Sequence, residues 1–192
     1  DVILFVAPAS IIGARLYYVI FSWDLYRDNP IYIFNTRKGG LAIYGGVIAG
    51  LLTAYIYCRV KKIKPLKFID FGVPYVVMAQ GIGRWGNFFN QEAFGNITDL
   101  PWRMNGDIIN RFLLDKYPGI NLEVWGVHPT FLYESIWNFA VFFFLIWFRS
   151  RKKADGEVFC LYMAGYGLGR FFIEGLRADS LMLGLSGIRV SQ

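Results

Sequence analysis

The chain has 192 residues, of which 55% are hydrophobic and 19% aromatic, and its formal net charge at pH 7 is +6. A soluble domain of this length does not need 18 Phe, 12 Tyr and 6 Trp, so the composition indicates a polytopic membrane protein made of one domain. The lysines and arginines lie in short clusters beside apolar runs, as they do in loops next to a membrane, which argues against a nucleic-acid partner.

Apolar segments follow one another along the chain, each long enough at about 1.5 Å per residue to cross a hydrocarbon layer of about 30 Å. The first is interrupted by Arg15, which either reaches a membrane interface or faces a polar cavity. Gly46 and Gly50 form a GxxxG pair in the second, which favours close helix packing. The sequence thus predicts an all-α fold with about five transmembrane helices in this fragment. They are expected at roughly 2–22, 40–58, 69–88, 129–148 and 157–176.

The basic clusters predict the orientation of these helices. Residues 59–67 carry five basic side chains and no acid, and a second basic block occupies 149–153. Both are expected to be cytoplasmic loops under the positive-inside rule. The polar stretch 89–127 has five acids and three bases and is expected outside, as a small lobe with short helices or strands. Alternation then puts the start of the fragment inside, with a further helix expected before Asp1 and another after Gln192.

Polar side chains gather at the outer end of the third segment, in GRWGNFFNQEAFG (83–95). A cation and an amide at membrane depth are costly and therefore point to function. Arg84 and Asn87 are neighbours on one face if the helix continues this far, and Glu92 follows. Glycines at 81, 83 and 86 leave room for a large group to approach the backbone.

The fifth segment carries a polar stripe in YGLGRFFIEGLR (166–177), where Tyr166, Arg170, Glu174 and Arg177 are spaced to share one helical face. Its simplest structural explanation is an ion pair between Arg170 and Glu174. The functional hypothesis is that Arg84 and Arg170 form one anion site, because guanidinium groups bind phosphate through charge-assisted hydrogen bonds. The abundant phosphate in a membrane belongs to lipid headgroups.

A third polar group, HPTFLYE (128–134), opens the fourth segment. His128 is the only histidine in the chain and is either a hydrogen-bonding residue at the helix entry or a base. Glu134 already lies inside the helix and needs a partner if it faces protein.

Together with GGLAIYGG (39–46), these motifs resemble the prolipoprotein diacylglyceryl transferase family, in the family's order and over most of the chain. The resemblance implies a seven-helix protein of the bacterial cytoplasmic (inner or plasma) membrane with a periplasmic head and its active site toward the outer leaflet. The fragment then corresponds to a single transmembrane domain, 1–192, lacking the flanking helices, with 89–127 as its extracytoplasmic lobe.

The resemblance also implies the reaction. The diacylglyceryl group of phosphatidylglycerol passes to the lipobox cysteine of a preprolipoprotein signal peptide, forming a thioether and releasing glycerol phosphate, as the first step of lipoprotein maturation. Neither a metal nor a cofactor is expected, and the partners are membrane lipid and the signal peptide. Carried over to this chain, the catalytic residues are Arg84, Arg170, Tyr44 and Glu92. The substrate-binding residues are Arg84, Asn87, Tyr166, Arg170, His128, Glu174 and Arg177.

Tyr44 departs from the family pattern, which often has His at this position. The pKa of tyrosine is near 10 and that of histidine roughly 6.5, so tyrosine is a poor base at neutral pH. We expect Tyr44 to donate a hydrogen bond and orient the reacting groups, while His128 as the base, no side-chain base, and simple packing of Tyr44 remain open.

Three other classes of protein compete with the transferase. A transporter of an anionic ligand predicts inverted repeats or a polar path across both leaflets, and neither is visible in the sequence. A scaffold whose charges only pair leaves the one-sided clustering of polar residues as a coincidence. A membrane protease needs a Ser/His or paired-Asp constellation inside the segments, which is not visible either.

Overall fold

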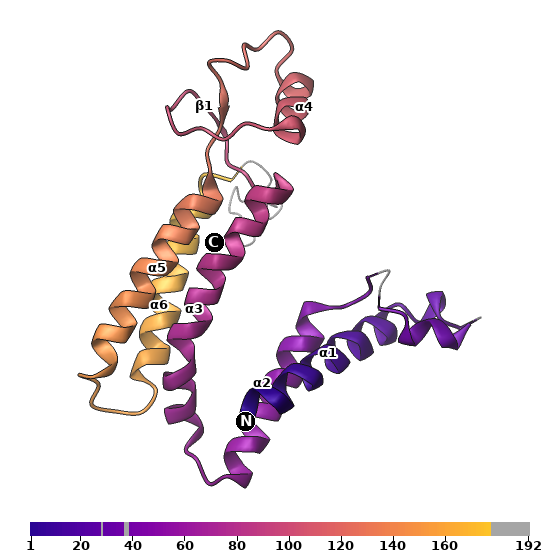
Figure 1. Cartoon of the computed structure of the whole chain (residues 1–192), viewed down its shortest axis with the longest axis vertical. Coiled ribbons are helices and arrows are strands. Elements are labelled where there is room, and N and C mark those ends of the chain that lie inside the picture. The colour runs from indigo at the N-terminus through magenta and orange to yellow at the C-terminus, as the bar shows by residue number, and fades with distance from the viewer. Residues whose placement is uncertain (28, 37–38, 178–192) are drawn as a thin grey trace, which may run out of the picture. The chain divides into compact units, whose positions relative to one another are not determined.

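The computed structural model describes residues 1–27, 29–36 and 39–177 (Figure 1). The described chain is mostly helical, as predicted, and it divides into two compact units, Asp1–Phe68 and Ile69–Gln192, each of which we describe by itself. The long helices are α1 (Val2–Phe21), α2 (Ile43–Val60), α3 (Pro65–Asn90), α5 (Thr130–Arg149) and α6 (Glu157–Glu174). The shorter elements are two 3-10 helices (Trp23–Leu25 and Pro30–Phe34), α4 (Asp107–Lys116), β1 (Ile97–Thr98) and β2 (Gly126–Val127).

Among the described residues, three helices are long and apolar enough to cross a membrane: α1, α2 and α5. Their composition supports the predicted membrane character. The helices α3 and α6 coincide with the other two predicted segments, and their crossing of the membrane stays a prediction.

In the first unit, α1 and α2 pack through small residues. A Cβ atom added to Gly46 would lie 3.3 Å from the carbonyl oxygen of Ser10, and one added to Gly50 would lie 2.6 Å from the Ser10 hydroxyl. A larger side chain at either position would push the helices apart. The prediction that the GxxxG pair permits close packing is therefore confirmed.

Arg15 holds the connection that follows α1. Its guanidinium is buried and donates through Nε to the carbonyl of Ile33 at 2.6 Å, and its two terminal nitrogens bond the carbonyls of Tyr32, Asn35, Gly39 and Gly40. Arg15 also lines a cavity of about 330 Å³. The positive charge of Arg15 is thus balanced by backbone carbonyls within this unit.

In the second unit, α5 and α6 form a hairpin and α3 packs against α5. Gly81 of α3 lies against Asn138 and Phe139, and Gly169 of α6 lies against the indole of Trp137. The apolar core between the three helices is made of Val73, Val77, Val141, Leu145 and Val158.

At the end of this hairpin that carries the second basic block, Asp70 of α3 is buried and accepts three hydrogen bonds. They come from Lys152 Nζ at 2.9 Å, the backbone N–H of Gly156 at 2.8 Å and that of Phe159 at 3.0 Å. The last two groups belong to the N-terminus of α6, whose N-cap is Gly156. Asp70 therefore caps α6 from a neighbouring helix.

Residues 91–129 form a small lobe that extends from α3 and α5 (Figure 1). It contains the short antiparallel pair β1–β2, in which Ile97 is opposite Val127, and the helix α4. The lobe has an apolar core of Met104, Ile109, Leu113 and Val127, to which Phe131 of α5 contributes. The short strands and helix expected for this stretch are present, and its position outside the membrane stays a prediction.

Candidate active site

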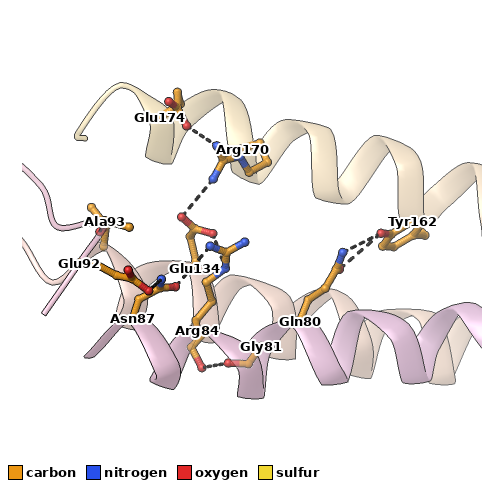
Figure 2. Close-up of polar contacts among 12 residues, drawn as sticks. Gln80, Gly81, Arg84, Asn87, Glu92, Ala93, Glu134, Tyr162, Arg170 and Glu174 are labelled. Atoms are coloured by element: carbon orange, nitrogen blue, oxygen red, sulfur yellow. Dashed lines mark hydrogen bonds and ion pairs between the residues drawn. The ribbon is translucent and has the colours of Figure 1, made fainter. Parts of the chain in front are cut away.

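The outer part of α3 remains helical through the motif, so Arg84 and Asn87 lie one turn apart, as predicted. Arg84 Nη1 is 3.5 Å from the Asn87 side-chain oxygen. The amide nitrogens of Asn87 and Asn90 donate to one oxygen of Glu92, at 3.1 and 3.2 Å. After α3 the backbone turns sharply, because Gln91 and Ala93 adopt left-handed conformations with φ near 50°. The motif thus folds back on itself, with the exposed Glu92 carboxylate held by two neutral amides. The contact with Asn87 is drawn in Figure 2.

Glu134 of α5 lies between the two motif arginines. One of its oxygens is 2.8 Å from Arg84 Nε of α3, and the other is 3.2 Å from Arg170 Nη1 of α6. Arg170 Nη2 also pairs with Glu174, one turn further along α6. Figure 2 shows both guanidinium groups directed at the Glu134 carboxylate. We call Arg84, Glu134, Arg170 and Glu174 the charge cluster.

The charge cluster joins three helices whose contributing residues are 50 and 36 positions apart in the sequence. The sequence predicted that Arg84 and Arg170 belong together, and the structure brings them to opposite sides of one carboxylate. It also shows the expected pair of Arg170 with Glu174, as part of a larger network. Glu134 was missing from the predicted site residues. Its signal was an acid inside an apolar helix, but the sequence did not reveal its partners.

The carboxylates of the cluster are more deeply buried than its cations. The side chains of Glu134 and Glu174 are 6% and 4% exposed, whereas those of Arg84 and Arg170 are 25% and 20% exposed. Two arginines and two carboxylates give the cluster a formal charge of zero. Buried charges are tolerated when they are paired and hydrogen-bonded in this way, and loss of one partner leaves an uncompensated charge.

Tyr166 and Arg177 are placed differently from one another. Tyr166 stacks on Tyr162 at 5.7 Å between ring centroids and lines a small hollow together with Glu134 and Arg170. Arg177 does not share the helical face of Arg170, because α6 ends at Glu174 and Gly175 forms its C-cap. Its backbone instead pairs with Gly95 at the base of the lobe. The prediction that all four residues of the stripe lie on one helix is therefore wrong at Arg177.

His128 lies at the junction of the lobe and α5. Its Nδ1 is 3.3 Å from the Tyr133 hydroxyl, which accepts a hydrogen bond from the indole of Trp102 at 2.9 Å. The Tyr133 hydroxyl can either donate to Nδ1 or accept a second hydrogen bond from it, so this contact is compatible with both ring tautomers of His128. Among the described residues, no hydrogen bond or ion pair joins His128 to the charge cluster. This arrangement favours a hydrogen-bonding role for His128 over that of a base.

Tyr44 belongs to the other unit. It lies in the first turn of α2, and its side chain is 71% exposed. Within its own unit the hydroxyl is open to a partner, which suits a residue that donates a hydrogen bond.

Among residues 1–27, 29–36 and 39–177, no three His, Cys, Asp or Glu side chains gather as metal ligands would. The polar groups that converge in the second unit are guanidinium groups, carboxylates and amides. Guanidinium groups in partly buried surroundings bind phosphate and stabilise developing negative charge.

The fold and this site define a helical protein of membrane character whose charge cluster presents two partly exposed guanidinium groups. Comparison with known proteins defines the family: residues 1–192 match the family model "Prolipoprotein diacylglyceryl transferase". The chain belongs to the prolipoprotein diacylglyceryl transferase family.

Several similar proteins carry the name phosphatidylglycerol–prolipoprotein diacylglyceryl transferase. One from Clostridium botulinum (strain 657 / Type Ba4) is 50% identical over 192 residues, covering 100% of this chain and 74% of that protein. One from Clostridioides difficile (strain 630) is 48% identical over 184 residues, covering 96% of this chain and 68% of that protein. One from Finegoldia magna is 46% identical over 193 residues, covering 100% of this chain and 71% of that protein.

Proposed function

We propose that this protein transfers the diacylglyceryl group of phosphatidylglycerol to prolipoproteins, the first step of lipoprotein maturation. Family membership supports the transferase over the transporter, scaffold and protease alternatives. The observation that carries the proposal is that three family motifs, distant in sequence, meet in the charge cluster through Arg84, Glu134 and Arg170.

The reaction balances as a substitution at carbon. The lipobox cysteine loses its thiol proton to solvent, since the thiolate is the nucleophile. Its sulfur forms a bond to the glyceryl carbon of the lipid while the bond from that carbon to the phosphate oxygen breaks. The products are a thioether and glycerol phosphate, and the phosphodiester becomes a monoester with greater negative charge.

The two guanidinium groups, which are the more exposed members of the neutral cluster, suit this increase in negative charge. A donor that is directed at a developing anion and held in place by its surroundings contributes about 10²- to 10³-fold to a rate. Arg84 and Arg170 are held by Glu134 and Glu174, so the two guanidinium groups are already oriented before the reaction begins.

The remaining residues of the site have supporting roles in this proposal. Asn87 and Glu92 shape the Arg84 side of the site, and Tyr166 borders the hollow beside Arg170. Glu174 holds Arg170 from its own helix. His128 and Arg177 secure the polypeptide where the lobe meets α5 and the end of α6. Tyr44 is assigned by its motif alone, as a hydrogen-bond donor to the reacting groups.

We further place the enzyme in the bacterial cytoplasmic membrane, with its site and the lobe toward the outer face. Five of the described helices cross the membrane in this proposal: α1, α2, α3, α5 and α6. The basic blocks at 59–67 and 149–153 support this orientation under the positive-inside rule.

A transfer assay tests the function directly. Radiolabelled phosphatidylglycerol is incubated with the protein and a lipobox peptide, and in parallel with the same peptide carrying Ser in place of its cysteine. Label should appear only on the cysteine peptide. The Arg84→Ala and Arg170→Ala variants should fold in detergent and transfer no label. Labelling of both peptides, or of neither, contradicts the proposal.

A further inference from the structure

The turn that follows α3 carries Glu92 between two residues in the left-handed conformation. Gln91 has a φ of 50° and Ala93 a φ of 52°. For residues other than glycine this conformation is unfavourable, so it is populated only where neighbouring groups hold the backbone in place. Contacts on both sides of Glu92 are therefore needed to keep this turn, and with it the direction of the Glu92 carboxylate.

One anchor holds Ala93 and another holds Gln91. The carbonyl of Ala93 accepts a hydrogen bond from the buried hydroxyl of Thr130, at the start of α5. Gln91 is held by the lobe, because its side-chain oxygen accepts a hydrogen bond at 2.9 Å from the backbone N–H of Ile108. Ile108 lies in the first turn of α4, whose N-cap residue, Gly106, has no side chain that could accept from it. The motif turn thus caps α4, and α4 in return fixes Gln91.

Gly106 leaves the space that this contact needs. A Cβ atom added there would overlap the side-chain amide of Gln91, 2.5 Å from its Cδ and 3.0 Å from its Nε2. The φ of Gly106 is 168°, extended backbone that any residue adopts, so the contact requires its small size and not its conformation. The Gln91 amide ends a flexible side chain and can move away from such a Cβ atom, but in doing so it leaves Ile108.

The anchored turn leads directly into the candidate active site (Figure 2). The backbone N–H of Glu92 bonds the Asn87 carbonyl at 3.0 Å, and the Glu92 carboxylate accepts from the Asn87 amide at 3.1 Å. Asn87 in turn contacts Arg84. A change in the backbone of Gln91 therefore redirects the Glu92 carboxylate without removing any group of the site.

We propose that Gln91 is a positioning residue, which uses its hydrogen bond to the N-terminus of α4 to hold the Glu92 carboxylate in the site. The lobe thereby sets the geometry of the motif. This inference rests on the proposed function, because an effect on catalysis requires that Glu92 takes part in the transfer. If Gln91 were only a cap for α4, its loss would weaken the lobe and leave the transfer rate unchanged.

Substitutions of Gln91 separate the anchor from the backbone conformation. Gln91→Ala loses the anchor but still needs the left-handed backbone, so kcat should fall about tenfold, with KM for phosphatidylglycerol within about threefold of wild type. Gln91→Glu keeps an acceptor at the helix N-terminus, so its kcat should stay within about threefold of wild type. Gln91→Gly loses the anchor but adopts the conformation readily, so its kcat should lie above that of Gln91→Ala. Wild-type kcat in Gln91→Ala, or the reverse order of the glycine and alanine variants, would overturn the proposal.

Gly106→Ala tests the same contact from the lobe. It should lower kcat as Gln91→Ala does, and it should add nothing in the Gln91→Ala/Gly106→Ala variant, because the amide that it displaces is already gone. Ile109→Val is the control, since it loosens the packing of α4 in the lobe core and leaves the Gln91 contact in place. It should lower the unfolding temperature with kcat unchanged. Additive losses in the double variant, or an equal loss of kcat in Ile109→Val, would contradict the role of Gln91.

Hydrogen exchange at the Ile108 amide measures the contact without any turnover. In the intact protein in detergent, exchange should accelerate at least about fivefold in Gln91→Ala and in Gly106→Ala, and stay within about twofold in Gln91→Glu. Unchanged exchange in the first two variants would refute the anchor. If exchange responds as expected but the wild-type protein transfers no lipid, the proposed function alone is refuted. If exchange responds and the wild type is active, but every Gln91 variant keeps the wild-type kcat, the positioning role alone is refuted.

Discussion

Asp70 offers a sharp test of how the second unit is held together. Its buried carboxylate accepts one hydrogen bond from Lys152 and two from the N-terminus of α6, at 2.8–3.0 Å. Hydrogen bonds to a charged group are worth about 1.5–3 kcal/mol each. The three together give an upper limit of roughly 4.5–9 kcal/mol, which water at the freed α6 N–H groups reduces. We therefore expect Asp70→Ala to cost about 3–5 kcal/mol, mainly because the two α6 N–H groups lose their acceptor.

Thermal unfolding of the protein in detergent measures this loss. For a chain of this size, 1 kcal/mol corresponds to about 2–4 °C, so the unfolding temperature should fall by roughly 6–20 °C. Asp70→Asn should fall by less, because its amide oxygen can still accept from one α6 N–H group. Asp115→Ala, which removes an exposed carboxylate on α4, serves as the matched control and should change little. If Asp70→Ala and Asp115→Ala unfold within 2 °C of each other, the capping argument is wrong.

Three further predictions concern other parts of the chain. The hydrogen bond to Asp70 raises the pKa of Lys152 above its usual value. The stability that this pair contributes is therefore present below about pH 10.5 and is lost as the pH rises through the raised pKa of Lys152. The difference in unfolding temperature between the wild type and Lys152→Met should accordingly disappear at high pH. The control variant Lys153→Met should show no such change with pH. Arg15→Lys should loosen the connection after α1, since one ammonium cannot donate to five carbonyls. At a cost of about 2 kcal/mol, hydrogen exchange at the amides of Tyr32 and Asn35 should accelerate about 30-fold. Unchanged exchange would show that Arg15 does not hold this connection. Tyr44→Phe should lower the transfer rate without abolishing it, because tyrosine at neutral pH is a hydrogen-bond donor and not a base; complete loss of activity would instead indicate proton transfer.

Much of the architecture could be predicted from sequence because it depends on local patterns. Apolar runs of spanning length predicted the long helices, and the glycine pair at 46 and 50 predicted the close contact of α1 with α2. The spacing of Arg84 and Asn87 predicted their contact, since residues three apart in a helix are neighbours. The same reasoning failed at Arg177. The helical spacing of polar residues continues in the sequence past Gly175, but the helix α6 ends at Glu174.

The contacts that define the site depend on the tertiary structure. Periodicity shows that Glu134 lies on a helix, but it cannot show which charges from other helices will surround it. Likewise, the sequence offered no sign that Asp70 would cap α6 or that Arg15 would bind five carbonyls.

The sequence by itself thus determined the helical membrane class, the order of the motifs and the presence of an arginine in each of two of them. Only the tertiary structure decided that these arginines meet through Glu134 and that their charges are unequally balanced. The physical reason is that a buried charge needs oppositely charged or hydrogen-bonding partners. In this protein those partners come from other helices, and the packing of the helices decides which of them come within reach.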